Sequence, residues 1–254
     1  MLILKRSATL QTEFWDNIAC KDDKMRAMYP MEALTKVQLE RIRVNQDDTL
    51  LEIGSGYGRL TIPLAKVAKG VTVVEPSRRM VAILRRNALA QGIKNLRFIN
   101  KRWEDVKIGK DIMKHDIVLA SFSLLLLDLK GALQKIDLAT KKVAYIFLSA
   151  ESWIPEDIQK LVFGEGFKIL SDHIIVYNLL HSLGIEANVE IMDYEAKRRF
   201  TTVEEAVKEF AEVYMIPDSK IGLLKDHLRN SLIKDADGLW HIRRKKVAMI
   251  WWSR

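Results

Sequence analysis

The residues with the clearest chemical meaning form a glycine-rich segment, Leu51-Glu-Ile-Gly-Ser-Gly-Tyr-Gly. Its glycines Gly54, Gly56 and Gly58 follow an apolar run, and they let the backbone turn tightly and approach a ligand without obstruction by a Cβ atom. A dinucleotide loop would carry a small residue where this chain has Arg59, and a phosphate loop would need a Gly-Lys-Ser/Thr sequence. The segment therefore predicts a ligand other than a dinucleotide or a nucleoside triphosphate.

Two carboxylates narrow the choice of ligand. Glu52 stands just before Gly54, where a negative charge repels a pyrophosphate but suits an ammonium group. Glu75 ends a second apolar run about 20 residues after the first glycine, where an acid accepts hydrogen bonds from ribose hydroxyls. A ligand with a ribose, an amino group and no phosphate is S-adenosyl-L-methionine, which we predict as the cofactor.

On these residues, the segment from about 45 to 150 resembles the class I S-adenosylmethionine-dependent methyltransferases. The glycine segment matches the first motif of that family, and Val73-Val-Glu-Pro-Ser-Arg-Arg-Met matches its second. The resemblance implies that Glu75 holds the ribose and that Pro76 and Met80 flank the adenine. The segment from Tyr177 to Glu190 also resembles uncharacterised methyltransferases of anaerobic archaea.

Two later motifs extend the resemblance. Trp103-Glu-Asp resembles the loop after the third strand, and His115-Asp-Ile-Val-Leu-Ala-Ser resembles the fourth-strand motif. Trp103 either stacks on adenine or packs in the core. Arg102 stands where the family often has an acidic residue that bonds the adenine amino group. The resemblance therefore implies that Glu104 or the nearby backbone makes this bond instead. The implied cofactor-binding residues are Glu52, Gly54, Ser55, Gly56, Tyr57, Gly58, Glu75, Pro76, Met80, Trp103, Glu104 and Ser121.

The elements that must position these residues are short apolar runs separated by helix-like segments. Strands alternating with helices predict βαβ units and a parallel sheet. The fold class is therefore α/β, a Rossmann-like class I methyltransferase fold with a seven-stranded, mostly parallel sheet and helices on both faces. The predicted strands cover residues 50–53, 71–74, 96–99, 117–120, 143–148, 188–192 and 246–252.

Helical patterns divide the rest of the chain. We predict an N-terminal helical extension over residues 1–44, with a helix at 31–42, ahead of a methyltransferase domain at 45–254. A helix over 173–183 ends at a glycine, and a helical insertion at 202–234 separates the last two strands. The N-terminal arm, with Phe14 and Trp15, and the insertion are candidates for a lid and an acceptor pocket.

Composition excludes several classes of protein. The chain has 254 residues, 48% of them hydrophobic, and a net charge of +8. Its single cysteine, Cys20, rules out an internal disulfide scaffold and any thiolate-rich metal site, so no metal is predicted. The apolar start at Met1 is too short for a signal peptide, and no run approaches the length of a membrane span. We expect a cytoplasmic protein.

No catalytic residue is assigned, because methyl transfer from a sulfonium needs mainly alignment and exclusion of water. The fourth strand ends in Ala-Ser-Phe-Ser and lacks the Asn/Asp-Pro-Pro-Tyr/Phe sequence of enzymes that methylate amino groups of adenine or glutamine. Cys20 lies away from the motifs, which argues against cysteine-dependent cytosine chemistry. A small-molecule acceptor is therefore favoured.

Three alternatives stay open at the level of sequence. The basic clusters Lys197-Arg-Arg and Arg243-Arg-Lys-Lys would form one basic surface if the last two strands pair, which would suit an RNA or protein substrate. A noncatalytic S-adenosylmethionine-binding regulator is a second alternative, and a dehydrogenase a third. His173, Tyr177 and His181 share one helical face, and we interpret them as structural rather than metal-binding residues.

Overall fold

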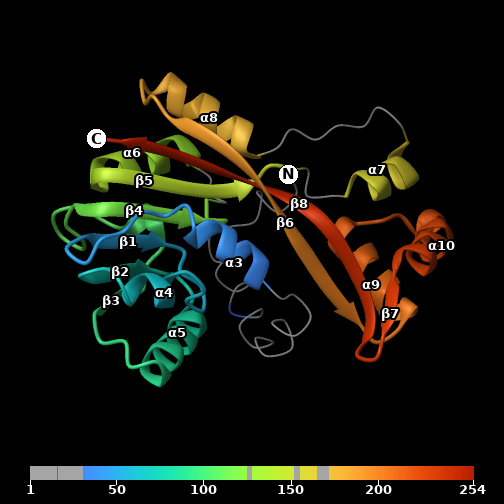
Figure 1. Cartoon of the computed structure of the whole chain (residues 1–254). Coiled ribbons are helices and arrows are strands. Elements are labelled where there is room, and N and C mark those ends of the chain that lie inside the picture. Colours follow the sequence, from blue (N-terminus) through green and yellow to red (C-terminus); the bar gives the residue numbers. More distant parts are fainter. Residues whose placement is uncertain (1–15, 17–30, 125–127, 152–154, 165–171) are drawn as a thin grey trace.

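The computed structural model describes residues 16, 31–124, 128–151, 155–164 and 172–254. Within these ranges the strands form one eight-stranded sheet in the order β3-β2-β1-β4-β5-β8-β6, with β7 paired to β8 (Figure 1). The α/β class and the mostly parallel, Rossmann-like arrangement are confirmed. The seven strands of the main path are those that the sequence predicts, and β7 (Ile233–Asp235) is an additional short strand beside β8.

Five parallel strands make up the first part of the sheet. Most of their residues are buried, because helices cover both faces, and such strands read as continuous apolar runs. Each of them begins or ends within a few residues of its predicted position. The five are β1 (Thr49–Ile53), β2 (Gly70–Val74), β3 (Leu96–Ile99), β4 (His115–Ser121) and β5 (Thr140–Ser149).

Two long antiparallel strands complete the sheet. β8 (Gly238–Ser253) pairs with β5 on one side and with β6 (Asn188–Phe200) on the other, and the β6–β8 pairing runs without interruption over the whole of β6. Both strands are much longer than predicted. They leave the sheet as a two-stranded antiparallel ribbon, which we call the hairpin although a helical insertion joins its strands. It reaches toward α9 (Val203–Tyr214) and α10 (Ile221–Ser231) (Figure 1).

Helices cover the two faces of the sheet. α3 (Glu32–Leu39), α4 (Thr61–Ala65) and α5 (Arg78–Ala90) pack on one face, while α6 (Leu129–Ala139) and α8 (Asp172–Ser182) pack on the other (Figure 1). The predicted helices near residues 31–42 and 173–183 are confirmed, the first somewhat shorter than expected. Each face therefore has its own hydrophobic core beneath its helices.

A third hydrophobic core lies at the far end of the hairpin. It is built by α7 (Glu156–Phe163), α9 (Val203–Tyr214) and α10 (Ile221–Ser231), with a short 3-10 turn, η3 (Asp218–Lys220), before α10. Thr202 caps α9 by accepting a hydrogen bond from the Glu205 N–H. We call this core the distal cluster; its buried members are Ile158, Val162, Phe200, Ala206, Val207, Phe210, Tyr214, Ile216, Leu224 and Leu228.

Some predictions concern parts of the chain outside the described residues. Phe14, Trp15 and Cys20 belong to this group, so their predicted roles stay predictions. The boundary between residues 44 and 45 lies within the described residues and also stays a prediction. In the part of the chain that the structure describes, no helix is both long and apolar enough to cross a membrane.

Candidate functional site

The glycine segment forms a tight loop between β1 and α4. The φ angles of Gly54, Gly56 and Gly58 are +72°, +54° and +95°, a region that side-chain-bearing residues rarely adopt. A Cβ atom on Gly54 would lie 2.3 Å from the Cβ of Ser123, and one on Gly58 would lie 2.2 Å from Leu84 Cδ1. At Gly56 no described atom lies within 4 Å of such a Cβ. Packing therefore explains the outer glycines, while the central one faces space that a ligand can enter.

Glu75 ties this loop to the end of β2. Its Oε2 accepts a hydrogen bond from the Gly56 N–H at 2.9 Å, and its Oε1 accepts one from the Ser77 N–H at 3.0 Å. Burial raises the pKa of Glu75, and the two N–H donors oppose that shift by favouring the carboxylate. Each carboxylate oxygen can accept a further hydrogen bond. The group therefore has the capacity that two ribose hydroxyls require.

The start of α5 lies beside Glu75. Ser77 caps this helix by accepting a hydrogen bond from the Met80 N–H at 3.1 Å, and its hydroxyl also bonds to the carboxylate of Asp16. Asn100 Nδ2 donates to the carbonyl of Pro76 at 2.9 Å. The structure thus brings Pro76 and Met80 to the same sheet edge as Glu75, and it places Asp16 of the N-terminal arm there too.

Glu52 is a buried acid on the same edge of the sheet. Its Oε2 accepts a hydrogen bond of 2.5 Å from the Thr61 hydroxyl, and only 3% of the residue is exposed. Burial raises its pKa to about 7, against the opposing effects of Thr61 and the Arg59 charge. A group that titrates near neutrality inside a site is a candidate for function, although structural networks also shift pKa values. The bond from Glu52 to a ligand ammonium group stays a prediction.

Ser55 and Tyr57 occupy the alternate positions of the loop. Ser55 is buried, and among the described groups its Oγ has no hydrogen-bond partner. A buried hydroxyl without a partner carries a free-energy cost, which a bound ligand can relieve. The Tyr57 carbonyl accepts a hydrogen bond from Asn87 Nδ2 at 3.1 Å, which fixes the loop to α5.

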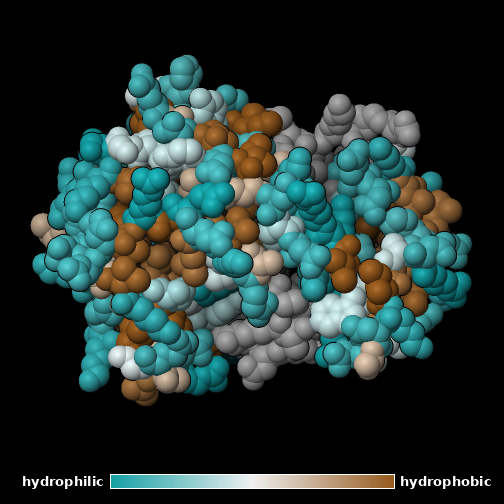
Figure 2. Space-filling view, viewed as in Figure 1, coloured by the Kyte–Doolittle hydropathy of each residue, from teal (hydrophilic) through white to brown (hydrophobic). Residues whose placement is uncertain are grey.

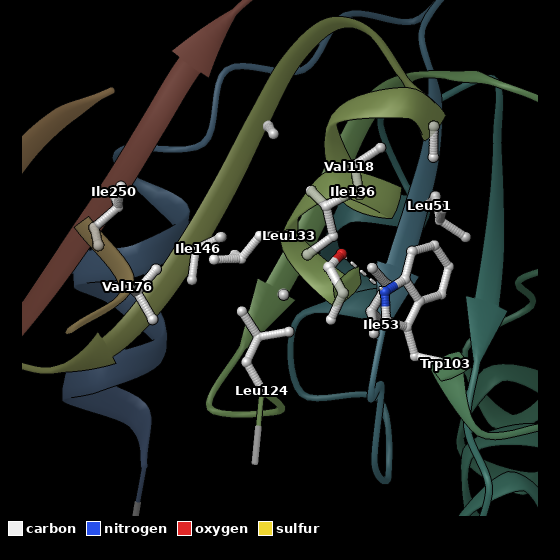
Figure 3. Close-up of a cluster of buried hydrophobic side chains, with 14 of the residues drawn as sticks. Leu51, Ile53, Trp103, Val118, Leu124, Leu133, Ile136, Ile146, Val176 and Ile250 are labelled. Carbon is white, nitrogen blue, oxygen red and sulfur yellow. Dashed lines mark hydrogen bonds between the residues drawn. The ribbon is translucent and has the colours of Figure 1, made fainter. Parts of the chain in front are cut away.

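Trp103 lies in the hydrophobic core. Its indole packs among Leu51, Ile53 and Leu133, and its Nε1 donates to the carbonyl of Ala132 at 3.3 Å (Figure 3). Only 3% of the residue is exposed, which leaves almost no ring surface for adenine. Of the two roles that the sequence allows, the geometry therefore supports core packing.

The acidic residue after Trp103 is on the surface. Glu104 belongs to a short 3-10 turn, η2 (Trp103–Asp105), where its side chain is exposed and its carbonyl accepts a hydrogen bond from Lys135 Nζ at 2.9 Å. Arg102 pairs with Asp105 at 2.7 Å. The contact between Glu104 and the adenine amino group stays a prediction.

Ser121, at the end of β4, is the centre of a polar network that the sequence did not reveal. Its Oγ accepts hydrogen bonds from Gln38 Nε2 at 3.0 Å and from Arg59 Nη2 at 3.3 Å. Arg59 Nη1 donates to the Thr35 hydroxyl at 2.9 Å. Gln38 is fully buried, and the sequence shows only that Arg59 stands at a loop position where a small residue is usual.

The loop after β4 presses against the glycine loop. Ser123 Oγ donates to the carbonyl of Ile53 at 2.5 Å, and Phe122 has a φ of +53°. A non-glycine residue in this region is strained by about 1–3 kcal/mol, and such residues often cluster at functional sites. Ser123, just after the end of the fourth strand, therefore lies against Gly54.

The sequence allows the two basic clusters to form one surface if β6 and β8 pair, and the two strands do pair. Successive side chains of a strand point to opposite faces, so each cluster is divided. Lys197, Arg199, Arg244 and Lys246 share the exposed outer face, and a role of this face in binding RNA or protein stays a prediction. On the outer face Lys197 and Arg244 pair with Glu195 and Asp193, both at 3.0 Å. Hydrophilic side chains cover much of the face in Figure 2, with hydrophobic areas between them.

The inner members of the same clusters point toward the helices. Arg198 pairs with Glu209, and Arg243 lies 3.5 Å from Asp157. On α8, Tyr177 and His181 are exposed while His173 is half-buried. Among the described residues, no group of three or more His, Cys, Asp or Glu side chains is placed to hold a metal ion.

The strand order is that of a Rossmann-like fold, with the glycine loop after β1 and the carboxylate after β2 at one edge of the sheet. Residues 50–143 match the family described as "Methyltransferase domain". This part of the chain is therefore similar to a methyltransferase domain.

Individual relatives and one solved structure are similar to the chain over different lengths. An uncharacterised protein of Haemophilus influenzae is 26% identical over 94% of this chain and 88% of its own length. A probable ribosomal RNA small subunit methyltransferase A of Methanosphaera stadtmanae is 28% identical, over 47% of this chain and only 39% of its own length. The YcgJ protein of Bacillus subtilis shares the fold, with a TM-score of 0.57, 12% identity, and coverage of 87% of this chain and 97% of that one.

Proposed function

We propose that this chain binds S-adenosylmethionine at the glycine loop and transfers its methyl group to a small-molecule acceptor. The observation that carries the proposal is the Glu75 carboxylate, which bridges the Gly56 and Ser77 N–H groups beside open space. The unpartnered Ser55 hydroxyl next to it supports the same ligand. Tyr57, Pro76 and Met80 complete the proposed cofactor surface.

The residues of the chain position the reactants rather than activate a nucleophile. When bound, the sulfonium supplies a methyl group that is already activated by positive charge. Glu75 and the glycine loop hold the nucleoside, while Glu52 offers a carboxylate to an ammonium group. The end of β4 at Ser121 and the strained Phe122 define the side from which the acceptor approaches. Such alignment supplies roughly 7–11 kcal/mol toward a transfer reaction.

The charge distribution favours a small acceptor over RNA. An RNA-binding face needs lysines and arginines that are free to contact phosphates. On the outer face of the hairpin, two of the basic residues are already paired with carboxylates on β6. Each cluster is also divided between the two faces, which reduces the positive charge that the outer face presents.

Calorimetry tests the cofactor. S-adenosylhomocysteine, the product form, should bind the full chain, and NAD should not. Binding of NAD alone would replace the proposal with the dehydrogenase alternative. Binding of S-adenosylhomocysteine without methyl transfer to any member of a broad acceptor panel would favour the noncatalytic regulator.

A salt titration tests the acceptor class. If the acceptor is small, binding to RNA should be weak and should change little with salt. A substrate RNA would instead lose affinity steeply as salt rises, because each phosphate contact releases counterions. A steep salt slope together with methyl transfer to RNA would reverse the choice of acceptor.

A further inference from the structure

Arg59 is a half-buried cation that the Glu52 carboxylate attracts without an ion-pair contact. Its two hydrogen bonds go to the neutral hydroxyls of Thr35 and Ser121. Within the described part of the chain it forms no ion pair, and burial lowers its pKa by disfavouring the charged form. A guanidinium has five N–H donors, so several donors remain after these two bonds. A buried, partly satisfied guanidinium is suited to a carboxylate or phosphate, which it binds with paired hydrogen bonds.

Two more donors lie on the hairpin, whose strand β6 contacts the helix α3 that carries Thr35, a partner of Arg59. Tyr194 and Lys245 are directly opposite each other on β6 and β8, and both side chains are half-buried. The charge of Arg59 acts on the Tyr194 phenol, whose pKa burial raises to about 12, so the phenol keeps its proton at neutral pH. In the described ranges neither side chain takes part in a hydrogen bond or an ion pair.

Ser121 supplies the fourth donor. Its oxygen already accepts bonds from Gln38 and Arg59, so its own O–H proton is available to a ligand. Few negative charges lie nearby, and one of them, Glu52, acts on Arg59. Glu151 acts on both Tyr194 and Lys245, while Arg243 adds a second positive charge near Lys245. Donors and positive charge therefore outnumber acceptors on the acceptor side of β4.

We propose that Arg59, Ser121, Tyr194 and Lys245 form an anion-binding site that recognises a carboxylate or phosphate group on the methyl acceptor. The inference rests on the proposed function, because it assumes that the acceptor approaches the end of β4. It adds the chemical class of the acceptor, an acidic small molecule. It also assigns Arg59 and Lys245 as residues that determine specificity.

Two anions, used at constant ionic strength, test whether the site binds an anion and whether it prefers a carboxylate or a phosphate. Phosphate and malonate are titrated separately against the full chain with S-adenosylhomocysteine present, and the affinity is obtained from calorimetry or from the rise in Tm. The variants are Lys245→Met and Arg59→Met. Their matched controls are Lys246→Met and Arg199→Met, whose side chains are exposed on the other face of the same hairpin.

We expect at least one anion to bind the unmodified chain and both controls. Binding should weaken roughly ten- to a hundredfold in Lys245→Met and Arg59→Met, as the loss of a charge-assisted hydrogen bond predicts. A preference for malonate identifies a carboxylate acceptor, and a preference for phosphate identifies a phosphorylated one. If Arg59→Met does not fold, Lys245→Met still decides the question.

The proposal fails if neither anion binds, or if binding survives both substitutions. Calorimetry with S-adenosylhomocysteine on the same samples separates the two levels of inference. Intact cofactor binding without anion binding overturns only the acceptor class. Absence of cofactor binding overturns the proposed function, whatever the anions do.

Discussion

At the sheet edge where β1 and β2 end, the structure depends on backbone conformation. At the far end of the β6–β8 hairpin, it depends on the packing of large side chains. The first region depends on glycines in a left-handed conformation and on one carboxylate, Glu75, that bonds two N–H groups. The second depends on the packing of aromatic rings. The ring centroid of Phe210 lies 5.9 Å from that of Phe200 and 5.3 Å from that of Tyr214. We call the glycine loop and Glu75 the cofactor edge, after the function proposed for them. Single positions define this edge, while the distal cluster only requires residues of suitable size and polarity.

The largest expected effect tests whether the two regions are independent. Phe210→Ala removes the fully buried ring at the centre of the distal cluster and should lower the free energy of unfolding by about 3–5 kcal/mol. Urea denaturation measures this loss, and hydrogen exchange should place it in α9. Affinity for S-adenosylhomocysteine should stay unchanged in the folded protein. A parallel loss of affinity would mean that the cofactor edge depends on the distal cluster.

A glycine substitution tests the claim that the cofactor edge is specified position by position. Gly54→Ala places a Cβ 2.3 Å from that of Ser123 at a φ of +72°, and it should cost about 2–4 kcal/mol of stability. The control is Gly184→Ala, which has a similar φ of +73° but no described atom within 4 Å of the added Cβ. It should cost only about 1–2 kcal/mol. Equal Tm values for the two variants would contradict the steric explanation.

The two regions should also respond to pH in opposite directions. Burial raises the pKa of Glu52 to about 7, so the unfolded chain loses this proton first and Glu52 makes the fold less stable as pH rises from about 4.5 to 7. Burial lowers the pKa of His241, beside Phe210, to about 4, so the unfolded chain gains a proton first and stability falls as pH drops from about 6.5 to 4.

Each of these contributions is about 3 kcal/mol at its limit. Urea denaturation across this pH range measures them in Glu52→Gln and in His241→Gln. The first substitution should remove the loss of stability toward neutral pH, and the second should remove the loss toward acid. An unchanged pH profile in either variant would refute the assignment of that group.

The smallest expected effect concerns cofactor affinity alone. Glu75→Ala should weaken S-adenosylhomocysteine binding by about 1–3 kcal/mol, because the ribose hydroxyls and two backbone N–H groups lose their acceptor. Glu195→Ala, which removes an exposed carboxylate of β6, is the control and should bind normally. Calorimetry that finds equal affinity for the two variants would remove Glu75 from the cofactor site.

The sequence predicts the cofactor half of the molecule better than the hairpin, for a physical reason. Parallel strands buried on both faces are continuous apolar runs, and glycines with positive φ are visible as glycines. The outer parts of β6 and β8 alternate half-buried and exposed charged residues. Lys197-Arg-Arg and Arg243-Arg-Lys-Lys therefore resemble surface charge clusters in the sequence, although both lie inside strands.

Contacts between residues far apart in the chain limit how many site residues can be predicted from the sequence. Nothing local indicates that Gln38 and Arg59 meet at Ser121, since these residues lie on three separate elements. The roles of Trp103 were open for the same reason, because an aromatic residue after a strand fits either a core or a ligand. The turn at Asp237-Gly238, which joins β7 to β8, carried a recognisable hairpin signal, but the short β7 before it read as part of the helical insertion.

The uninterrupted pairing of β6 with β8 acts as a spacer of fixed length. Thirteen residue pairs, from Asn188 with Trp251 to Phe200 with Leu239, extend over roughly 40 Å. Removing one residue pair would shorten this spacer and move the side chains beyond the deletion, including Tyr194 and Lys245 where they follow it, to the opposite face. Removing two pairs would keep every side chain on its face and bring the distal cluster about 7 Å closer to the sheet. Length changes in steps of two pairs thus offer related chains a way to adjust the room for an acceptor without altering the chemistry of its walls.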